Sequence, residues 1–169
     1  MTGSLNDFTV PVFTRALTNM AIHLDKGKAH ADERKVDFKG FAESRLIADM
    51  HPLINQVQIA CDNSKGPIAR LAGIEAPKHE DTEKTFDELK ARIAKTLDFI
   101  GGVKREQFAG AEQREIVLKF PNVTLTFNGQ DYVTKFALPN FYFHATMAYA
   151  LLRQNGVVLG KRDFLGAIQ

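Results

Sequence analysis

Two histidines, His51 and His144, are the residues of this chain with the clearest capacity for chemistry. A neutral imidazole can accept a proton near neutral pH or bind a transition metal. His144 stands among aromatic residues, so it is either a core histidine hydrogen-bonded across the protein or the lining of a cleft. Asn140 and Ala148 stand one helical turn before and after it, so no second histidine accompanies it on the same face of a helix.

A stripe of polar residues follows His51 along the chain. Spacings of four, three and four residues place the stripe on one face of a helix, and its members are His51, Asn55, Gln58 and Asp62. The stripe is either the solvent-facing side of that helix or the wall of a polar pocket that faces Asn140 and His144.

Arg45 and Asp49 are four residues apart, near the expected start of the same helix. As an exposed pair along a helix they would contribute only about 0.5 kcal/mol. As a buried pair they could anchor an anionic group of a ligand.

The composition is that of an ordinary globular protein and argues against several functional classes. The chain has 169 residues, 44% hydrophobic, with 22 basic and 20 acidic residues and a net charge of +2, which does not favour a nucleic-acid partner. The single cysteine, Cys61, excludes an intrachain disulfide and fits a cytoplasmic location. The most apolar stretch, 141–152, is shorter than the ~20 residues that span a membrane, so no membrane association is expected. Residues 1–169 are expected to form one domain.

The spacing of apolar residues predicts four long helices, of which the first two contain prolines. The first spans residues 4–31, and Pro11 either bends it or stands in its first turn. The second spans residues 43–72, and we expect Pro52 and the Gly66-Pro67 pair to bend or interrupt it.

The third and fourth helices have clearer ends. The third begins after Thr85, which has capping-box spacing with Glu88, and ends at Gly101-Gly102. The fourth spans residues 139–154 and is closed by Asn155-Gly156.

Between the third and fourth helices the apolar period changes to two, which predicts strands. The pair Asn128-Gly129 suits a two-residue hairpin turn, with Gln130–Lys135 as the strand that follows it. We therefore expect a meander of two or three antiparallel strands. So small a sheet must pack against an apolar surface.

The fourth helix carries apolar side chains in every direction around its axis, and such a helix needs cover on all sides. In a four-helix bundle one side of each helix normally faces water. We therefore expect the meander or a second subunit to cover it, and we predict a homodimer through the fourth helix.

Several segments together give the chain a family resemblance. They are Arg45-Leu46, Asp49-Met50, Gln56–Asp62, Phe136–His144 and Gly156–Phe164. On these segments the chain resembles a bacterial domain-of-unknown-function family that is similar to the DinB/YfiT-like superfamily. The resemblance implies a mainly α fold, an antiparallel four-helix bundle with a small β-hairpin or meander inserted between helices three and four. It also implies frequent dimerisation and a cleft where many relatives hold a divalent metal through three histidines.

The chain departs from this family pattern at the metal ligands. In those relatives the second helix supplies one histidine and the fourth helix supplies a pair one turn apart. Here His51 and His144 are present and the paired ligand is missing. Because a catalytic transition-metal site normally has about three protein ligands, we predict an incomplete metal site and no metal cofactor.

The leading hypothesis is a protein that binds a small ligand in a polar cleft between helices two and four. The candidate lining residues are His144, His51, Asn140, Arg45, Asp49 and Gln58. One alternative is a divalent-metal-dependent hydrolase or thiol transferase that uses His51, His144 and a third ligand such as Asp49 or Asn140. Another is a non-enzymatic interaction protein whose fourth helix recruits a partner chain.

Overall fold

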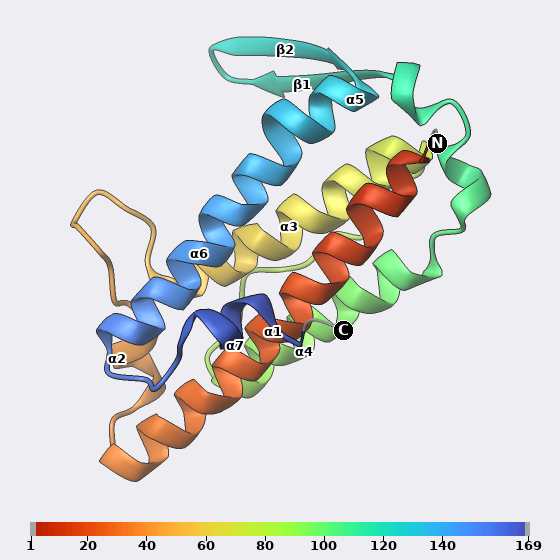
Figure 1. Ribbon diagram of the computed structural model, residues 1–169. Helices are drawn as coiled ribbons and strands as arrows, with labels where there is room; N and C mark the ends of the chain where they lie inside the picture. Colours follow the sequence, from red (N-terminus) through yellow and green to blue (C-terminus); the bar gives the residue numbers. More distant parts are fainter. Residues whose placement is uncertain (1–2, 168–169) are drawn as a thin grey trace.

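Four long helices form the body of the protein, and the computed structural model describes residues 3–167 (Figure 1). In chain order the elements are α1 (Leu5–Arg34), α2 (Phe38–Ala42), α3 (Leu53–Ala72), α4 (Phe86–Gly102), η1 (Arg105–Phe108), η2 (Ala111–Gln113), β1 (Glu115–Phe120), β2 (Val123–Asn128), α5 (Gly129–Asp131), the π-helical segment η3 (Tyr132–Ala137), α6 (Leu138–Gln154) and α7 (Lys161–Leu165). The predicted mainly α fold, with a small β-hairpin between the third and fourth long helices, is confirmed.

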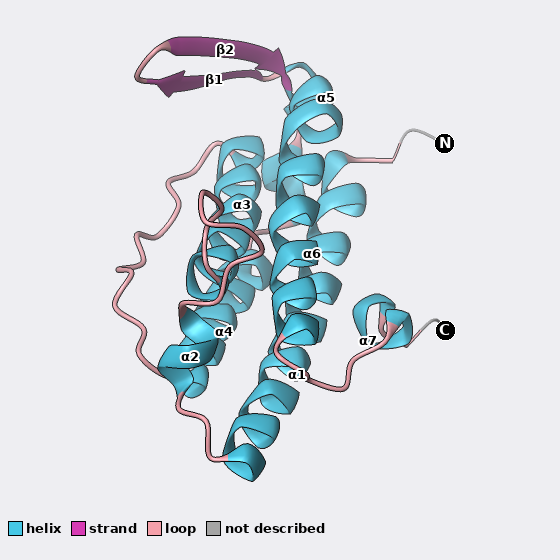
Figure 2. Ribbon diagram, turned by 90° about the vertical axis from the view of Figure 1, so that its left-hand side faces the viewer, coloured by secondary structure: helices cyan, strands magenta, loops and turns pink. Residues whose placement is uncertain are grey.

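The long helices form two antiparallel pairs. α1 runs against α4, because Asp7 in the first turn of α1 pairs with Arg105, just beyond the end of α4, at 2.6 Å. α3 runs against α6, because Arg70 near the end of α3 meets Tyr132, just before the start of α6, at 3.2 Å. The loop 73–85 returns along the bundle, so α3 and α4 run in the same direction (Figures 1 and 2).

The start of α1 is set by Ser4 rather than by Pro11. The Ser4 side chain accepts a hydrogen bond from the backbone of Asn6 and forms a capping box with Asp7. Pro11 lies inside the helix, on its exposed side. The carbonyl of Asp7 loses its helical partner there and can be hydrated.

The predicted start of the second long helix at residue 43 is wrong, because α3 begins only at Leu53. Pro52 stands at the N-cap in an extended conformation, which a residue leaving a loop adopts and a helix interior does not allow. Residues 43–52 form a loop instead, closed by hydrogen bonds from Leu53 to the carbonyl of Ser44 and from Arg45 to the carbonyl of Met50.

The expected interruption at Gly66-Pro67 is absent, because α3 continues through Pro67 to Ala72. Gly73, in the left-handed conformation with φ 69°, ends the helix as predicted. Pro67 has no N–H, so the carbonyl of Asn63 has no helical partner from it. The helix surface at Asn63 therefore carries a backbone carbonyl without this helical hydrogen bond.

The expected third strand at Gln130–Lys135 is also wrong. β1 and β2 pair from Glu115 opposite Asn128 to Phe120 opposite Val123, so the hairpin turn is Pro121-Asn122. The side chain of Asn128 accepts the backbone N–H of Asp131 at 2.8 Å and caps α5. Asn128-Gly129 thus begins the helical stretch that continues through η3 into α6.

The hairpin packs on η3, at the end of the bundle (Figure 2). The ring of Phe136 lies 6.1 Å from that of Phe127, 6.3 Å from that of Phe120 and 6.0 Å from that of Tyr132, measured between centroids. This aromatic cluster is the apolar support that a two-stranded sheet needs.

The meander was one of two covers expected for α6, and it does not cover this helix. Phe141 and Ala148 are buried, whereas Tyr142 is 40% and Phe143 is 50% exposed. The hairpin packs against η3 and leaves this face of α6 open. No helix within residues 3–167 combines the length and the hydrophobicity that crossing a membrane requires.

Candidate functional site

His144 on α6 is held by Gln56 on α3. Its Nδ1 lies 2.7 Å from Gln56 Oε1, and the residue is only 8% exposed. Gln56 Nε2 donates in turn to the backbone carbonyl of His51 at 2.9 Å, which fixes the orientation of the amide. Nδ1 of His144 must therefore carry the proton, and Nε2 carries the lone pair.

The environment keeps this imidazole neutral. Burial lowers the pKa of His144 below the ordinary value of 6.5, and the nearby His51 lowers it further. Within residues 3–167 the only hydrogen bond of the ring is the one at Nδ1. Nε2 can therefore accept a hydrogen bond or a proton from a bound molecule.

The residues around His144 do not fit the three-histidine metal site of the family pattern. His51 lies on the exposed loop before α3, not on a helix as predicted. Across residues 3–167 there is no group of three or more His, Cys, Asp or Glu side chains that could hold a metal ion. The described residues therefore lack the set of about three protein ligands that a catalytic transition-metal centre has.

The other predicted site residues are dispersed. Arg45 and Asp49 are exposed in the loop 43–52, where Arg45 donates to the carbonyl of Met50. They are not helical neighbours, so the predicted i, i+4 pair along the second helix is wrong. Asn140 does lie on α6, one turn before His144, and faces a cavity described below.

Gln58 faces neither solvent nor His144, contrary to both readings of the polar stripe. It is buried and donates to Glu83 at 2.8 Å, and Arg92 of α4 binds the same carboxylate at 3.0 Å. Arg92 also pairs with Asp62 at 3.2 Å and Asp81 at 2.8 Å, although its side chain is only 2% exposed. Burial alone would raise the pKa of Glu83, but the hydrogen bonds from Gln58 and Arg92 outweigh it and lower the pKa. This network fastens the loop 73–85 to α3 and α4.

Facing polar side chains of α3 and of the η3–α6 helix form a polar seam between the two. Its members are Gln56, Asn63, Arg70, Tyr132, Asn140 and His144. The seam is closed at one end by the Gln56–His144 contact and at the other by the Arg70–Tyr132 hydrogen bond at 3.2 Å. A cavity of about 230 Å³, the seam cavity, is lined by Asn63, Asn140, Arg70 and Tyr132 together with β1 and Phe136.

Asn63 brings an unsatisfied group to the seam cavity. Its Nδ2 is buried and has no hydrogen-bond partner within residues 3–167. A buried donor without a partner costs about 1–3 kcal/mol, so such groups are uncommon in folded proteins. Gln56, Asn63 and Arg70 are not among the site residues predicted from the sequence, although their seven-residue spacing indicates that they share one face of α3.

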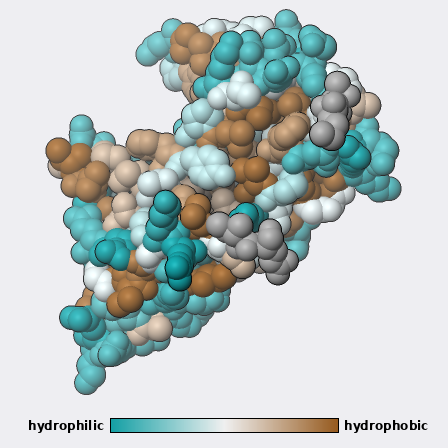
Figure 3. All heavy atoms as spheres, viewed as in Figure 1, coloured by the Kyte–Doolittle hydropathy of each residue, from teal (hydrophilic) through white to brown (hydrophobic). Residues whose placement is uncertain are grey.

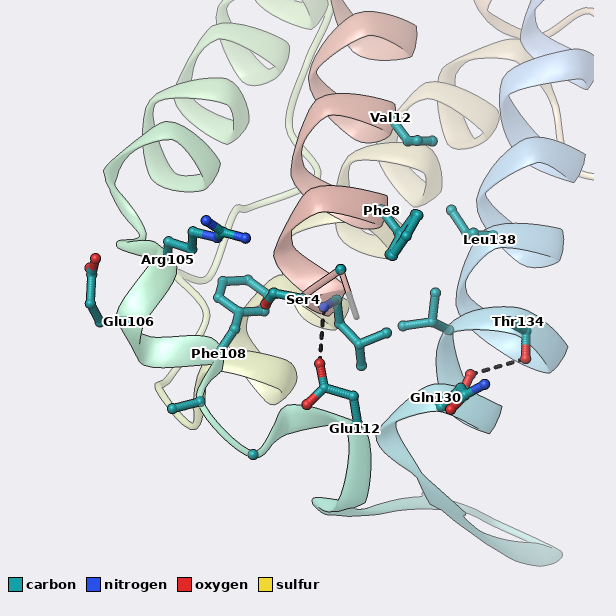
Figure 4. A pocket seen from close by; sticks show the side chains of 15 residues that line it. Ser4, Phe8, Val12, Arg105, Glu106, Phe108, Glu112, Gln130, Thr134 and Leu138 are labelled. Atoms are coloured by element: carbon teal, nitrogen blue, oxygen red, sulfur yellow. Dashed lines mark hydrogen bonds between the residues drawn. The ribbon is translucent and has the colours of Figure 1, made fainter. Parts of the chain in front are cut away.

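A larger hollow of about 1150 Å³ lies on the opposite side of η3, between the start of α1, the segment 105–112 and the start of α6 (Figure 4). Phe8 and Leu138 point toward each other across it, and Phe8 is 57% exposed. Glu112 closes one end by accepting the backbone N–H of Leu5 at 3.2 Å. Figure 3 shows hydrophobic residues gathered over this part of the molecule, where α1 and α6 lie side by side.

Cys61 has no chemical role in either hollow. It is fully buried in α3, and burial raises the pKa of its thiol to about 12. The thiol stays protonated at neutral pH and packs as a small apolar side chain.

Comparisons with known proteins agree with the fold. Residues 5–165 match the family described as Domain of unknown function (DUF1993). The structure is similar to the crystal structure of a DinB family member protein from Shewanella denitrificans, with a TM-score of 0.88 and 44% sequence identity over 97% of this chain and 93% of the other. No curated protein matches the sequence.

Proposed function

The chain belongs to the family described as Domain of unknown function (DUF1993), and on that premise we propose that it binds a small molecule in the polar seam between α3 and α6. The observation that carries the proposal is the seam cavity, a hollow flanked by two polar contacts with an unsatisfied buried donor, Asn63 Nδ2. Binding sites are typically hollows with a few convergent polar groups, and this one has that character.

His144 extends the site by one helical turn. It follows Asn140 by four residues on α6, so the two side chains lie on the same face. With Nδ1 held by Gln56, the Nε2 lone pair is oriented before any ligand arrives. A ligand hydroxyl or amide that reaches it would bind without reorganising the protein.

Replacing Asn63 by leucine is expected to stabilise the unliganded protein by about 1 kcal/mol, because it removes a buried donor that has no partner. Urea unfolding measures the change. The matched control is Asn55→Leu, also on α3, where the lost Asn55 Nδ2 to Gln58 Oε1 bond of 2.8 Å should reduce stability. Residues that bind a ligand often lower the stability of the free protein. A ligand site in the seam therefore predicts that Asn63→Leu raises the free energy of unfolding and that Asn55→Leu does not.

Binding itself is tested by recording the side-chain amide signals of the isotope-labelled protein during a screen of small fragments. We expect hits that shift the signals of Asn63 and Asn140, and we expect Asn63→Leu to abolish them. Hits confined to the hollow beside Phe8, together with a loss of stability in Asn63→Leu, would contradict the proposal.

We also propose that two copies associate through the open face of α6. Phe143 is 50% and Tyr142 is 40% exposed there, and burying apolar side chains is the main favourable term in subunit association. Phe143→Glu should convert a dimer into a monomer in light scattering at micromolar concentration. Val158→Glu, at an 84% exposed position outside α6, should leave the dimer intact. A monomeric native protein would contradict the prediction directly.

A further inference from the structure

The charges around the seam cavity are of one sign. Of the residues that line it, Arg70 and Lys119 are charged, and both are cationic. Neither has an ion-pair partner anywhere in residues 3–167, although the chain as a whole carries nearly as many acidic as basic residues. The charged side chains that line the cavity therefore give it a net positive charge.

Arg70 is held in place at the rim of the cavity. It donates from Nη1 to the hydroxyl oxygen of Tyr132 at 3.2 Å. Its guanidinium lies over Gly66, one turn earlier on α3, where a Cβ would stand only 2.8 Å from Nη1. A guanidinium keeps further N–H donors after making one hydrogen bond, and its planar fork suits an oxyanion.

Two uncharged donors supplement the cations. The hydroxyl oxygen of Tyr132 accepts from Arg70, so its proton remains to be donated. Burial raises the pKa of Tyr132, which keeps the phenol protonated, although Arg70 opposes the effect. Asn63 Nδ2 is the buried donor without a partner. Donors from α3 and η3 thus converge on the cavity from two sides.

The remaining wall is apolar, with two aromatic rings and the aliphatic side chains of Pro67, Val117, Leu118 and Ala137. Phe120 of β1 and Phe136 of η3 line the cavity, with their ring centroids 6.3 Å apart. The volume of about 230 Å³ is below the ~300–1,000 Å³ of sites for drug-sized ligands. The occupant must be small, with a flat or apolar body against these rings.

We infer that the seam cavity binds a small organic anion, whose carboxylate or phosphate oxygens are held by Arg70, Lys119, Tyr132 and Asn63 and whose apolar body lies against Phe120 and Phe136. This inference rests on the proposed function, since it names the class of ligand for the same cavity. Charge-assisted hydrogen bonds are the strongest available to such a ligand, so its charge should dominate its affinity.

The test compares benzoate and phenyl phosphate with benzamide, an uncharged probe of similar shape. Calorimetry measures the affinities, and the side-chain amide signals of Asn63 and Asn140 show where each probe binds. At least one of the two anions should bind about tenfold more tightly than benzamide, and the tighter one identifies the preferred oxyanion. Added salt should weaken the anions and leave benzamide unchanged.

Variants assign the charge to its residues. Arg70→Gln and Lys119→Gln should each weaken the bound anion, with Arg70→Gln costing about tenfold. Lys135→Gln is the matched control, because it removes an exposed cation of η3 that does not line the cavity. Lys119 is exposed on a strand, so its replacement keeps the test decisive even if Arg70→Gln disturbs packing.

Three results would overturn the inference. If benzamide shifts the signals of Asn63 and Asn140 and binds as tightly as the anions do, the ligand is not selected by its charge. The anion assignment then fails and the proposed small-molecule site stands. A probe concentration of about 10 mM exceeds the dissociation constants expected of such small probes. If no probe shifts these signals up to that concentration, both the anion assignment and the proposed small-molecule site fail. If an anion binds but both charge variants bind it like the native protein, the recognition by Arg70 and Lys119 is wrong.

Discussion

Replacing Gly129 by alanine is expected to lower the free energy of unfolding by about 3 kcal/mol or more, because a Cβ has no room there. It would overlap the carbonyl oxygen of Ala111 and stand 2.9 Å from the carbonyl carbon, and backbone atoms cannot rotate aside as a side chain can. Leu71 of α3 closes the same space, with Cδ2 at 3.3 Å. The backbone of Gly129 does not have a positive φ, so steric overlap alone causes the effect.

Urea unfolding of Gly129→Ala measures this loss, and Gly101→Ala is the control. Gly101 lies in α4 with no atom within 4 Å of an added Cβ, so alanine should be neutral or stabilise the helix by about 0.5–1 kcal/mol. Equal midpoints for Gly129→Ala and the native protein would show that η2 and α5 do not approach as closely as described. The contact between Gly129 and Ala111 matters for function because it lies where the helical stretch α5–η3–α6 begins. This stretch carries Tyr132, Asn140 and His144.

Replacing Gln56 by glutamate is expected to raise the pKa of His144, which burial lowers in the native protein. A carboxylate in place of the amide oxygen, 2.7 Å from Nδ1, would stabilise the charged imidazolium and offset its burial. The ring proton signals of His144 during a pH titration give the pKa. Asn55→Asp, which adds the same charge one residue away on α3, should change this pKa far less. A pKa of His144 in Gln56→Glu no higher than in the native protein would contradict the contact.

The same substitution should change how stability depends on pH. In the native protein the folded pKa of His144 is below the unfolded value, so the unfolded state binds more protons and stability falls as pH decreases through about 6.5. In Gln56→Glu the folded pKa of His144 is raised, so less stability is lost on acidification than in the native protein. The free energy of unfolding of the variant minus that of the native protein should therefore increase when the pH is lowered from 8 to 5. A constant difference would show that Gln56 does not control the proton on His144.

Local signals in the sequence were sufficient for most of the secondary structure. The capping spacing of Thr85 and Glu88, the period-two run from Ile116 to Phe127 and the apolar spacing of α3 all gave elements that the structure contains. They could be recognised because each depends on residues a few positions apart. The errors occurred where one local signal allowed two outcomes. Asn128-Gly129 suits a hairpin turn, but the same asparagine can cap a helix, and in the structure it caps α5 while Gly129 lies against the carbonyl of Ala111.

The candidate site was predictable in part. The sequence indicated that His144 and Asn140 share a face of the last long helix, and both lie on α6 four residues apart. It did not show that Gln56, rather than Gln58, faces His144, because the rotation of α3 about its axis follows from packing against both α4 and α6. Gln58 is turned toward Glu83, where Arg92 supplies a compensating charge.

The sequence by itself thus determined most of the secondary-structure elements and the family, since these depend on residue type and short spacing. Only the tertiary structure decided which polar side chains meet. The physical reason is that these contacts join side chains far apart in the sequence, such as Gln56 with His144, so they depend on how α3 packs against η3 and α6. This packing brings Tyr132 to Arg70 and leaves the seam cavity beside Asn63, where we propose that the ligand binds.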